Sequence, residues 1–315
     1  MNIRDSFKKY GKQFLKSTSA YSKHKSNSKR EQLVSKTKIP KQETSVLTMP
    51  IVEAPKQNPE STYSFLKTEP KRCDKTNYER EFVTRFKQLT YRHRSLEVWS
   101  DFVTMFACAI SNSLDKQNFD EREKLYLKII KKYSKDEQTI FPELAAMVVM
   151  SLEQNPEQDF LGYIYMNLGL GNKNTAQFFT PYHICQLIAE ITMSDIVNEV
   201  KAKGYISISD PCCGGGALLI AGINKAKDEL EKENLNFQNH VLIVAQDIDF
   251  TVAMMCYIQI SLLGAAGYVK VGNSLTDPIT DGDSLENYWF TPMYYSKTWS
   301  MRRMLNKLNN KETKT

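Results

Sequence analysis

The fold is decided by the stretch ISISDPCCGGGALLI, which occupies residues 206–220. It starts with alternating apolar residues, as a β-strand does, passes through Asp210-Pro211 and three glycines, and ends as an apolar helical run. A strand, a tight glycine-rich turn and a helix start form half of a nucleotide-type binding site. Glycine lets a ligand approach the backbone closely, and the N–H groups of a helix start favour a negative group. No Gly-Lys-Ser/Thr follows, so the turn is not a P-loop, and the same glycines would also suit plain packing.

Two more strands are predicted after this turn. Residues 241–245 form an apolar run suited to a buried parallel strand, which ends at Asp247. In doubly wound folds an acidic residue at the tip of the second strand binds ribose hydroxyls. A helix over residues 251–263, closed by Gly264, then leads to a third strand over residues 268–271.

The preceding region, residues 77–170, has helical periodicity. Apolar residues recur at helical spacing in three stretches, around residues 82–89, 96–110 and 125–130. A further helix is expected to begin at Pro142, because proline suits the first turn of a helix. The aromatic residues of these stripes are interpreted as core, and the region predicts a small all-helical domain.

A loop connects this region to the glycine-rich turn. It contains Gln177-Phe178-Phe179-Thr180-Pro181, with Thr180 predicted as the N-cap and Pro181 as the first residue of the next helix. The two phenylalanines would either plug the junction between domains or line a ligand pocket.

The positive charge is concentrated at the amino terminus. The chain carries a net charge of +6, yet residues 1–40 hold eleven Lys and Arg against Asp5 and Glu31 alone. Residues 1–76 are rich in polar residues and too poor in apolar ones to form a core, so a basic, mostly disordered arm is expected. Its apolar residues near the start, from Ile3 to Phe14, would form either a short docking helix or part of a solvated tail.

Composition excludes several classes of protein. The 315 residues are 41% hydrophobic and 25% charged, which is ordinary for a globular protein. No apolar run reaches the roughly 18–20 residues that span a bilayer, and the start lacks a secretory signal, so we expect no membrane and a cytoplasmic location. The six cysteines show neither a C-x-x-C pair nor a histidine at zinc spacing, which predicts reduced thiols and no metal site.

Three motifs then line up in order: QFFTP at 177–181, DPCCGGG at 210–216 and QD at 246–247. Together they resemble the adenine-N6 DNA methyltransferases of the type I modification-subunit kind, which use S-adenosylmethionine. The resemblance covers roughly residues 80–295 and implies a Rossmann-like class I methyltransferase sheet in an α/β fold. The chain is predicted to consist of a basic arm, 1–76; a helical domain, 77–170; an S-adenosylmethionine-binding domain, 171–296; and a basic tail, 297–315.

The resemblance also implies the cofactor contacts. They belong to the loop, the turn, the tip of the second strand and the residues after the third: Phe178, Thr180, Pro181, Asp210, Cys212, Gly214, Gly216, Asp247, Ile248 and Asn273. By position, the loop residues would line the methionine end and the turn would lie beneath the cofactor. Asp247 would hold the ribose hydroxyls and Ile248 would flank the adenine.

The sequence departs from the family at two places. The family usually has an acid where this chain has Asn273, near the adenine amino group of the cofactor. The catalytic tetrapeptide Asn/Asp-Pro-Pro-Tyr/Phe, which activates the target amino group and stacks the flipped base, does not occur. The nearest substitute is Thr291-Pro292-Met293-Tyr294, after a predicted fourth strand at 288–290, with Thr291, Pro292 and Tyr294 as candidate catalytic residues. The chain ends soon afterwards, so the sheet is expected to be truncated after this strand.

Three functions remain open from the sequence. The first is an S-adenosylmethionine-dependent adenine-N6 DNA methyltransferase of the restriction-modification type, with DNA as its partner and a specificity or completing subunit beside it. The second is a non-catalytic S-adenosylmethionine-binding, DNA-associated subunit with a degenerate catalytic motif. The third is a structural protein whose glycines only make a turn.

Overall fold

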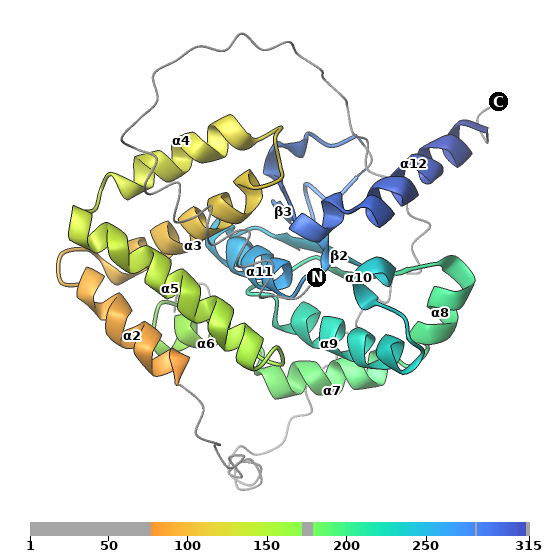
Figure 1. Cartoon of the computed structure of the whole chain (residues 1–315), viewed down its shortest axis with the longest axis horizontal. Coiled ribbons are helices and arrows are strands. Elements are labelled where there is room, and N and C mark those ends of the chain that lie inside the picture. Colours follow the sequence, from red (N-terminus) through yellow and green to blue (C-terminus); the bar gives the residue numbers. More distant parts are fainter. Residues whose placement is uncertain (1–76, 172–178, 281, 313–315) are drawn as a thin grey trace, which may run out of the picture.

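A computed structural model describes residues 77–171, 179–280 and 282–312. A four-stranded sheet lies at the centre, surrounded by helices (Figure 1). The predicted basic arm, residues 1–76, and Phe178 lie outside the described residues. The α/β class predicted from the sequence is confirmed.

Within residues 77–171, as the structure describes them, five helices confirm the predicted helical periodicity. They are α2 (Tyr78–Leu89), α3 (Ser95–Asn112), α4 (Phe119–Ile130), α5 (Lys135–Gln154) and α6 (Phe160–Asn167). Phe82 is fully buried, and its ring lies 5.5–6.1 Å from the rings of four other aromatic residues, among them Trp99 and Phe160. Edge-to-face contacts of this kind add to the free energy gained by burial, so these aromatics are core, as predicted.

The predicted start of α5 was wrong. Pro142 lies inside the helix, which begins at Lys135. Ser134 accepts a hydrogen bond from the backbone N–H of Glu137, and the Glu137 carboxylate accepts one from the N–H of Ser134. This capping box satisfies two N–H groups of the first turn, so the helix starts there and includes the proline.

The sheet has the strand order β1-β2-β3-β4. The strands are β1 (Ile206–Asp210), β2 (Val241–Asp247), β3 (Ala266–Val271) and β4 (Tyr288–Phe290), which confirms the four predicted strands. β1, β2 and β3 are parallel, whereas β4 is antiparallel to β3. The fourth strand therefore lies at the β3 edge and runs in the opposite direction to its neighbours.

The remaining helices link and cover the strands. They are α7 (Tyr182–Thr192), α8 (Ile196–Lys203), α9 (Ala217–Lys232), α10 (Phe237–His240), α11 (Phe250–Leu262) and α12 (Lys297–Glu312). Gly264 has φ +78° just beyond α11, as expected for a glycine that ends a helix. The N-cap of α7 is Pro181 rather than Thr180, so that helix begins one residue later than predicted.

The two faces of the sheet belong to different clusters of buried residues. Val241, Ile243 and Ala245 of β2 join the large cluster that extends from α2 to α11. The alternate residues Leu242 and Val244 join a smaller aromatic cluster around Tyr268, Tyr294 and Trp299. Since the large cluster spans the helical region and the sheet, both share one core, and their division into separate domains stays a prediction.

Arg122 ties the helical region to the outer edge of the sheet. This buried α4 residue forms a 2.7 Å ion pair with Asp115, and its guanidinium donates to the carbonyl oxygen of Tyr288 at 2.7 Å. It also lies 3.9 Å from the ring centroid of Trp289. These contacts fix β4 beside β3. Across the described ranges, no helix has the length and hydrophobicity needed to cross a membrane.

Candidate cofactor-binding pocket

A cavity of about 590 Å³ lies at the carboxyl ends of β1 and β2. Its lining includes Asp210 and Asp247, which end the two strands, and Gly214 and Gly215 of the turn between β1 and α9. The carboxyl ends of parallel strands are where ligands bind in open α/β sheets, and the volume suits a small-molecule ligand.

The glycine-rich turn is attached to both strand tips. The N–H of Cys212 donates to Asp210 Oδ1 at 3.0 Å, and that of Cys213 to the carbonyl oxygen of Gln246 at 3.0 Å. The N–H of Gly214, where φ is +51°, donates to Asp247 Oδ2 at 2.8 Å. These hydrogen bonds hold the turn between the two strand tips, with its backbone against the cavity.

Gly216 has a packing role at the end of this turn. Its φ is +93°, and a Cβ there would lie 2.9 Å from the Sγ atom of Cys256 on α11. Glycine therefore allows α9 to begin immediately against α11. Ala217 and Leu218, the first two residues of α9, line the cavity, so the positive end of this 16-residue helix is directed at it.

Asp247 is the hydrogen-bonding centre of the pocket. Besides the bond from Gly214, its Oδ1 accepts the N–H of Asp249 at 2.9 Å. Burial raises the pKa of Asp247, and these backbone hydrogen bonds offset part of the rise. Each carboxylate oxygen can accept a second hydrogen bond, so a pair of ligand hydroxyls can still bind there.

The described lining of the cavity is acidic. It contains four carboxylates, Asp159, Asp210, Asp247 and Asp249, and no Lys, Arg or His. Burial raises the pKa of Asp210, and it raises that of Asp159 to about 6. Since burying carboxylates without a counter-charge is costly, this lining favours a ligand with positive charge.

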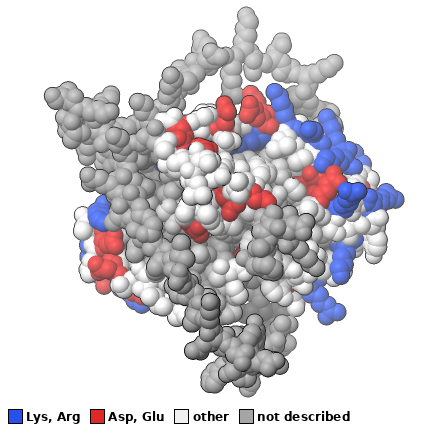
Figure 2. Space-filling view, turned by 180° about the vertical axis from the view of Figure 1, so that it is seen from behind, with Lys and Arg blue, Asp and Glu red and all other residues white. Residues whose placement is uncertain are grey.

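Charge is distributed differently on the outer surface. On the face shown in Figure 2, most Lys and Arg lie along the right-hand side, while Asp and Glu form scattered patches in the middle and also occur among them. After the half-turn between the views, that side corresponds to the side of Figure 1 where α2, α4 and α5 lie. On this face, many of the Lys and Arg side chains therefore lie on the helical region, with some Asp and Glu among them.

The structure brings most of the predicted cofactor residues together. The cavity lining includes Thr180, Asp210, Cys212, Gly214, Asp247 and Ile248. Gly216 and Pro181 lie next to it, at the starts of α9 and α7, without lining it. A role for any of these residues in cofactor binding stays a prediction.

The predicted cofactor residues leave out several side chains of the lining, among them Asp159 and also Phe179, which the sequence left open between plugging a junction and lining a pocket. Phe179 packs its ring 5.5 Å from that of Tyr165 and lies against Gly214, so it is a wall of the cavity. Asp159 is the N-cap of α6 and belongs to the region that was interpreted as purely structural. An aspartate immediately before the apolar run FLGYIY was a readable capping signal, but nothing local connects it to a turn more than fifty residues later.

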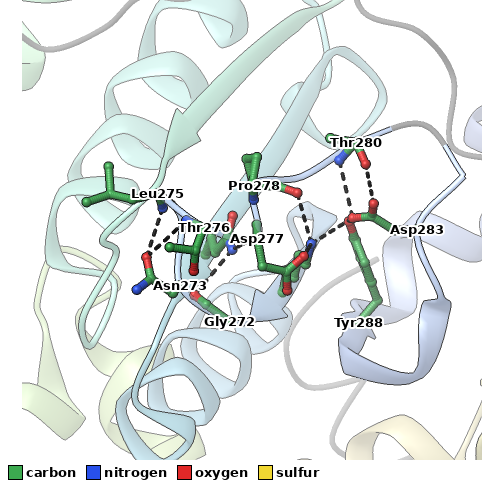
Figure 3. A network of polar contacts seen from close by, with 11 residues as sticks. Gly272, Asn273, Leu275, Thr276, Asp277, Pro278, Thr280, Asp283 and Tyr288 are labelled. Atoms are coloured by element: carbon green, nitrogen blue, oxygen red, sulfur yellow. Dashed lines mark hydrogen bonds and ion pairs between the residues drawn. The ribbon is translucent and has the colours of Figure 1, made fainter.

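The loop after β3 is held by a buried ion cluster (Figure 3). Lys270, with a side chain only 3% exposed, lies 2.7 Å from both Asp277 and Asp283. Burial lowers the pKa of Lys270, but the bonds to the two carboxylates outweigh this effect and raise it. Tyr288 also donates to Asp283, at 2.5 Å. The cluster fastens the loop to the β3–β4 edge.

Asn273 begins this loop but does not line the cavity. Its Oδ1 accepts the N–H groups of Leu275 at 2.9 Å and Thr276 at 3.4 Å (Figure 3). The side-chain oxygen is therefore engaged in the turn, and the amide nitrogen is the group that could donate to a ligand. Ser274 connects the loop to the pocket, with its Oγ 3.8 Å from Cys212 Sγ.

The candidate catalytic segment lies at the other end of the sheet. Because β4 is antiparallel, Thr291 is beside Ala265 and Gly267 at the start of β3, whereas Asp247 pairs with Val271 at its end. Four to six residues of strand separate these positions, which is roughly 13–20 Å. The structure does not bring Thr291, Pro292 or Tyr294 to the cavity.

Thr291 and Tyr294 are also fully engaged there. Thr291 is 0% exposed, and its hydroxyl donates to the carbonyl oxygen of Ala265 at 2.8 Å while accepting the N–H of Gly267 at 3.0 Å. The buried ring of Tyr294 stacks on Phe290 with centroids 4.8 Å apart, and the Arg303 guanidinium lies 4.0 Å from its centroid. A catalytic role for this segment stays a prediction, and none of its three candidate residues lines the cavity.

Among the described residues, two further features do not form a second centre. A cavity of about 650 Å³ between α5, α9 and α10 is lined by scattered polar side chains such as Glu153, Lys227 and Glu231, which do not converge. No cluster of three or more His, Cys, Asp or Glu residues with metal-binding geometry occurs in the part of the chain that the structure describes.

Comparison with known families identifies the chain. Residues 157–314 match the family model described as N-6 DNA Methylase. The match includes all four strands and begins just before Asp159, so it covers the whole pocket. This protein belongs to the N-6 DNA methylase family. The type I modification-subunit resemblance is consistent with this family, and membership implies S-adenosylmethionine as cofactor.

One solved structure is also similar to this N-6 DNA methylase family member. It is the crystal structure, at 2.20 Å resolution, of a putative class I S-adenosylmethionine-dependent methyltransferase from Listeria monocytogenes. The two are 16% identical, with a TM-score of 0.35, and the similarity covers 64% of this chain and 55% of that one. The chain thus spans about half the length of that methyltransferase. No curated protein matched the chain.

Proposed function

We propose that this chain binds S-adenosylmethionine in the acidic cavity and takes part in methylating the N6 atom of adenine in DNA. The observation that carries the proposal is the cavity itself. It lies at the carboxyl ends of the strands, it is lined by carboxylates, and it belongs to a chain of the N-6 DNA methylase family.

The cofactor's chemistry fits the residues present. S-adenosylmethionine carries a sulfonium cation and no phosphate, which suits an acidic lining without a P-loop lysine. Asp247 has free acceptor capacity for the ribose hydroxyls, and Ile248, 68% exposed on the rim, offers an apolar surface to the adenine. The N-terminus of α9 would receive the carboxylate of the methionine part. When bound, the cofactor supplies the methyl group.

DNA is the proposed substrate. An adenine inside a duplex cannot reach a pocket of this kind, so it must leave the base stack before reaction. The Lys and Arg side chains on the right-hand side of Figure 2 would contact the phosphates, since phosphate contacts by Lys and Arg supply most sequence-independent affinity. The basic arm would add to this attraction. Restriction-modification is the proposed setting.

The target adenine also needs an acceptor for its amino hydrogens and an aromatic surface for stacking. Thr291 and Tyr294 were the candidates within this sequence, but neither lines the cavity. We therefore propose that a completing subunit supplies the hydrogen-bond acceptor and the aromatic surface at the carboxyl end of the sheet. A specificity subunit would read the target sequence.

The experiment uses the purified chain, tritium-labelled S-adenosylmethionine and unmethylated genomic DNA. After incubation, retained cofactor is measured on the protein and labelled N6-methyladenine in digested DNA. Label in N6-methyladenine supports methyl transfer, and transfer by the chain alone would contradict the need for a completing subunit. Absence of retained cofactor at millimolar concentration would contradict the proposed function and favour a purely structural role.

A second candidate is a cofactor-binding, DNA-associated subunit without catalysis of its own. The distance of Thr291 from the cavity favours it. Retained cofactor without labelled DNA, in many DNA and partner conditions, would distinguish this subunit from an enzyme.

A further inference from the structure

We propose that Asp159 binds the α-ammonium group of the methionine part of S-adenosylmethionine. The proposal rests on the proposed function, because it names a ligand contact in the same cavity. It assigns to the helical region, which precedes the glycine-rich turn, a residue that determines which adenosyl compounds bind.

The first observation is the state of the Asp159 carboxylate. The residue is 9% exposed and lines the cavity. Its Oδ1 accepts two hydrogen bonds, from the N–H of Gly162 at 2.9 Å and from Gln259 Nε2 at 2.7 Å. Within the described ranges no donor reaches Oδ2. A carboxylate so deeply buried, with one oxygen left over beside a cavity, is a strong acceptor in need of a donor.

The second observation is that Gln259 holds this carboxylate against the glycine-rich turn. Gln259 of α11 is 0% exposed, and its Nε2 also donates to the carbonyl oxygen of Gly215 at 2.9 Å. Its Oε1 accepts the N–H of Leu161 at 3.1 Å. The amide is thus fully used, and it links the start of α6 directly to the turn. Asp159 cannot rotate away without breaking these bonds.

Two glycines leave room for the carboxylate. A Cβ at Gly162 would collide with Asp159 Oδ2, so a side chain there would displace the aspartate. A Cβ at Gly215 would lie 3.6 Å from Oδ2, which shows how closely the carboxylate approaches the turn. The free oxygen is therefore beside the backbone over which the methionine part of the cofactor would lie.

The chemistry selects an ammonium group as the donor. The described lining offers no Lys, Arg or His to neutralise Asp159, so a ligand has to supply the cation. An α-ammonium is compact and has three N–H donors, and charge-assisted bonds of this type are the strong ones. The adjacent N-terminus of α9 suits the α-carboxylate. Together these two features recognise both charges of an amino acid.

The test compares ligands that differ in this group. Binding of S-adenosylmethionine, S-adenosylhomocysteine and 5′-methylthioadenosine, which lacks the amino-acid part, is measured by calorimetry on the full chain and on Asp159→Asn. Asparagine keeps Oδ1 as the acceptor for Gly162 and Gln259 but removes the charge. We expect at least tenfold weaker binding of the first two ligands and less than a threefold change for methylthioadenosine. An equal loss for all three, or no loss, would overturn the proposal.

Two further measurements remain informative if Asp159→Asn folds poorly. Gly162→Ala, which displaces the carboxylate sterically, should produce the same selective loss. Wild-type protein should bind the analogue of S-adenosylhomocysteine without its amino group at least tenfold more weakly than the parent, and in Gly162→Ala this difference should disappear. A penalty that persists in the variant would assign the ammonium to another group.

The control is Asp120→Asn, the same chemical change at an exposed position of α4, which should leave all affinities unchanged. Thermal melting of each variant reports whether it is folded. Wild-type protein that binds none of the ligands contradicts the proposed function. Wild-type binding with an unselective effect at Asp159 contradicts only the assignment of this residue.

Discussion

Polar side chains at the two ends of the sheet differ in how much of their hydrogen-bonding capacity is already used within the protein. At the carboxyl end of β1 and β2, Asp159 and Asp247 keep unused acceptor capacity beside a cavity. At the amino end of β3, the hydroxyl of Thr291 is used as both donor and acceptor by neighbouring backbone groups. A motif residue can therefore bind a ligand only where neighbouring groups of the protein leave its hydrogen-bonding capacity unused.

The direction of β4 is responsible for this difference. A fourth strand parallel to β1 and adjacent to it would end at the cavity, as in the common doubly wound order. Here β4 turns back along β3, so the residues that follow it arrive at the opposite end. The predictions below test the ion cluster that holds this arrangement, then each end of the sheet, in order of decreasing effect.

The largest effect is expected for Lys270→Met, at the β3–β4 edge. Removal of the ammonium leaves Asp283, with a side chain only 12% exposed, without its cation. Loss of one partner from a buried ion pair costs about 3–5 kcal/mol in the free energy of unfolding. Urea denaturation measures this cost. The control, Lys232→Met, removes a 66% exposed ammonium from its pair with Glu229 and should cost less than about 1 kcal/mol.

Part of this comparison was predictable from the sequence. The carboxyl end was predictable because its features are local: an alternating strand, three glycines, and an acid after the apolar run that became β2. Once the strands are known to be parallel, these patterns place the glycine-rich turn and the acid at the same edge of the sheet. Six of the predicted cofactor residues accordingly line the cavity.

The direction of β4 and the position of Asp159 depend on distant contacts instead. Arg122 holds the carbonyl oxygen of Tyr288 from 166 residues away, and Gln259 holds Asp159 from 100 residues away. A strand of three residues carries no pattern that distinguishes parallel from antiparallel pairing. These contacts are formed by tertiary packing, so periodicity and motif spacing could not indicate them.

The second prediction concerns the stability of the cofactor-free protein. Burial raises the pKa of Asp159 to about 6 from 3.8, so the folded state disfavours its charged form. Above about pH 6 this penalty is nearly complete, and it fades as the pH falls, disappearing only below 3.8, where Asp159 is protonated in both states. Asp159→Asn should therefore stabilise the protein by up to about 3 kcal/mol at pH 7.5 and by about 1 kcal/mol or less at pH 4.5. Urea denaturation at both pH values measures the difference, and a gain independent of pH would contradict it.

The third prediction concerns the amino end. Thr291→Val removes the hydroxyl and leaves the N–H of Gly267 and the carbonyl oxygen of Ala265 without partners. The expected cost is about 2 kcal/mol of unfolding free energy, with the affinity for S-adenosylhomocysteine unchanged. Thr291→Ser keeps the hydroxyl and should cost less. A catalytic hydroxyl would give the reverse result, in which methyl transfer is lost from Thr291→Val while its stability stays that of the wild type.

The smallest effect is expected for Asp247→Asn, at the carboxyl end. The amide can still accept a ribose hydroxyl, but a neutral acceptor makes a weaker bond than a carboxylate, so binding should weaken by about tenfold, or 1.4 kcal/mol. Methylthioadenosine keeps the ribose, so it should weaken as much as S-adenosylmethionine, whereas Asp159→Asn should affect only the ligands with an amino group. One of the two backbone N–H groups held by Asp247 loses its acceptor, so thermal melting has to accompany the calorimetry. If Asp247→Asn discriminated between the two ligands, the ribose assignment would fail, because both ligands carry the same diol.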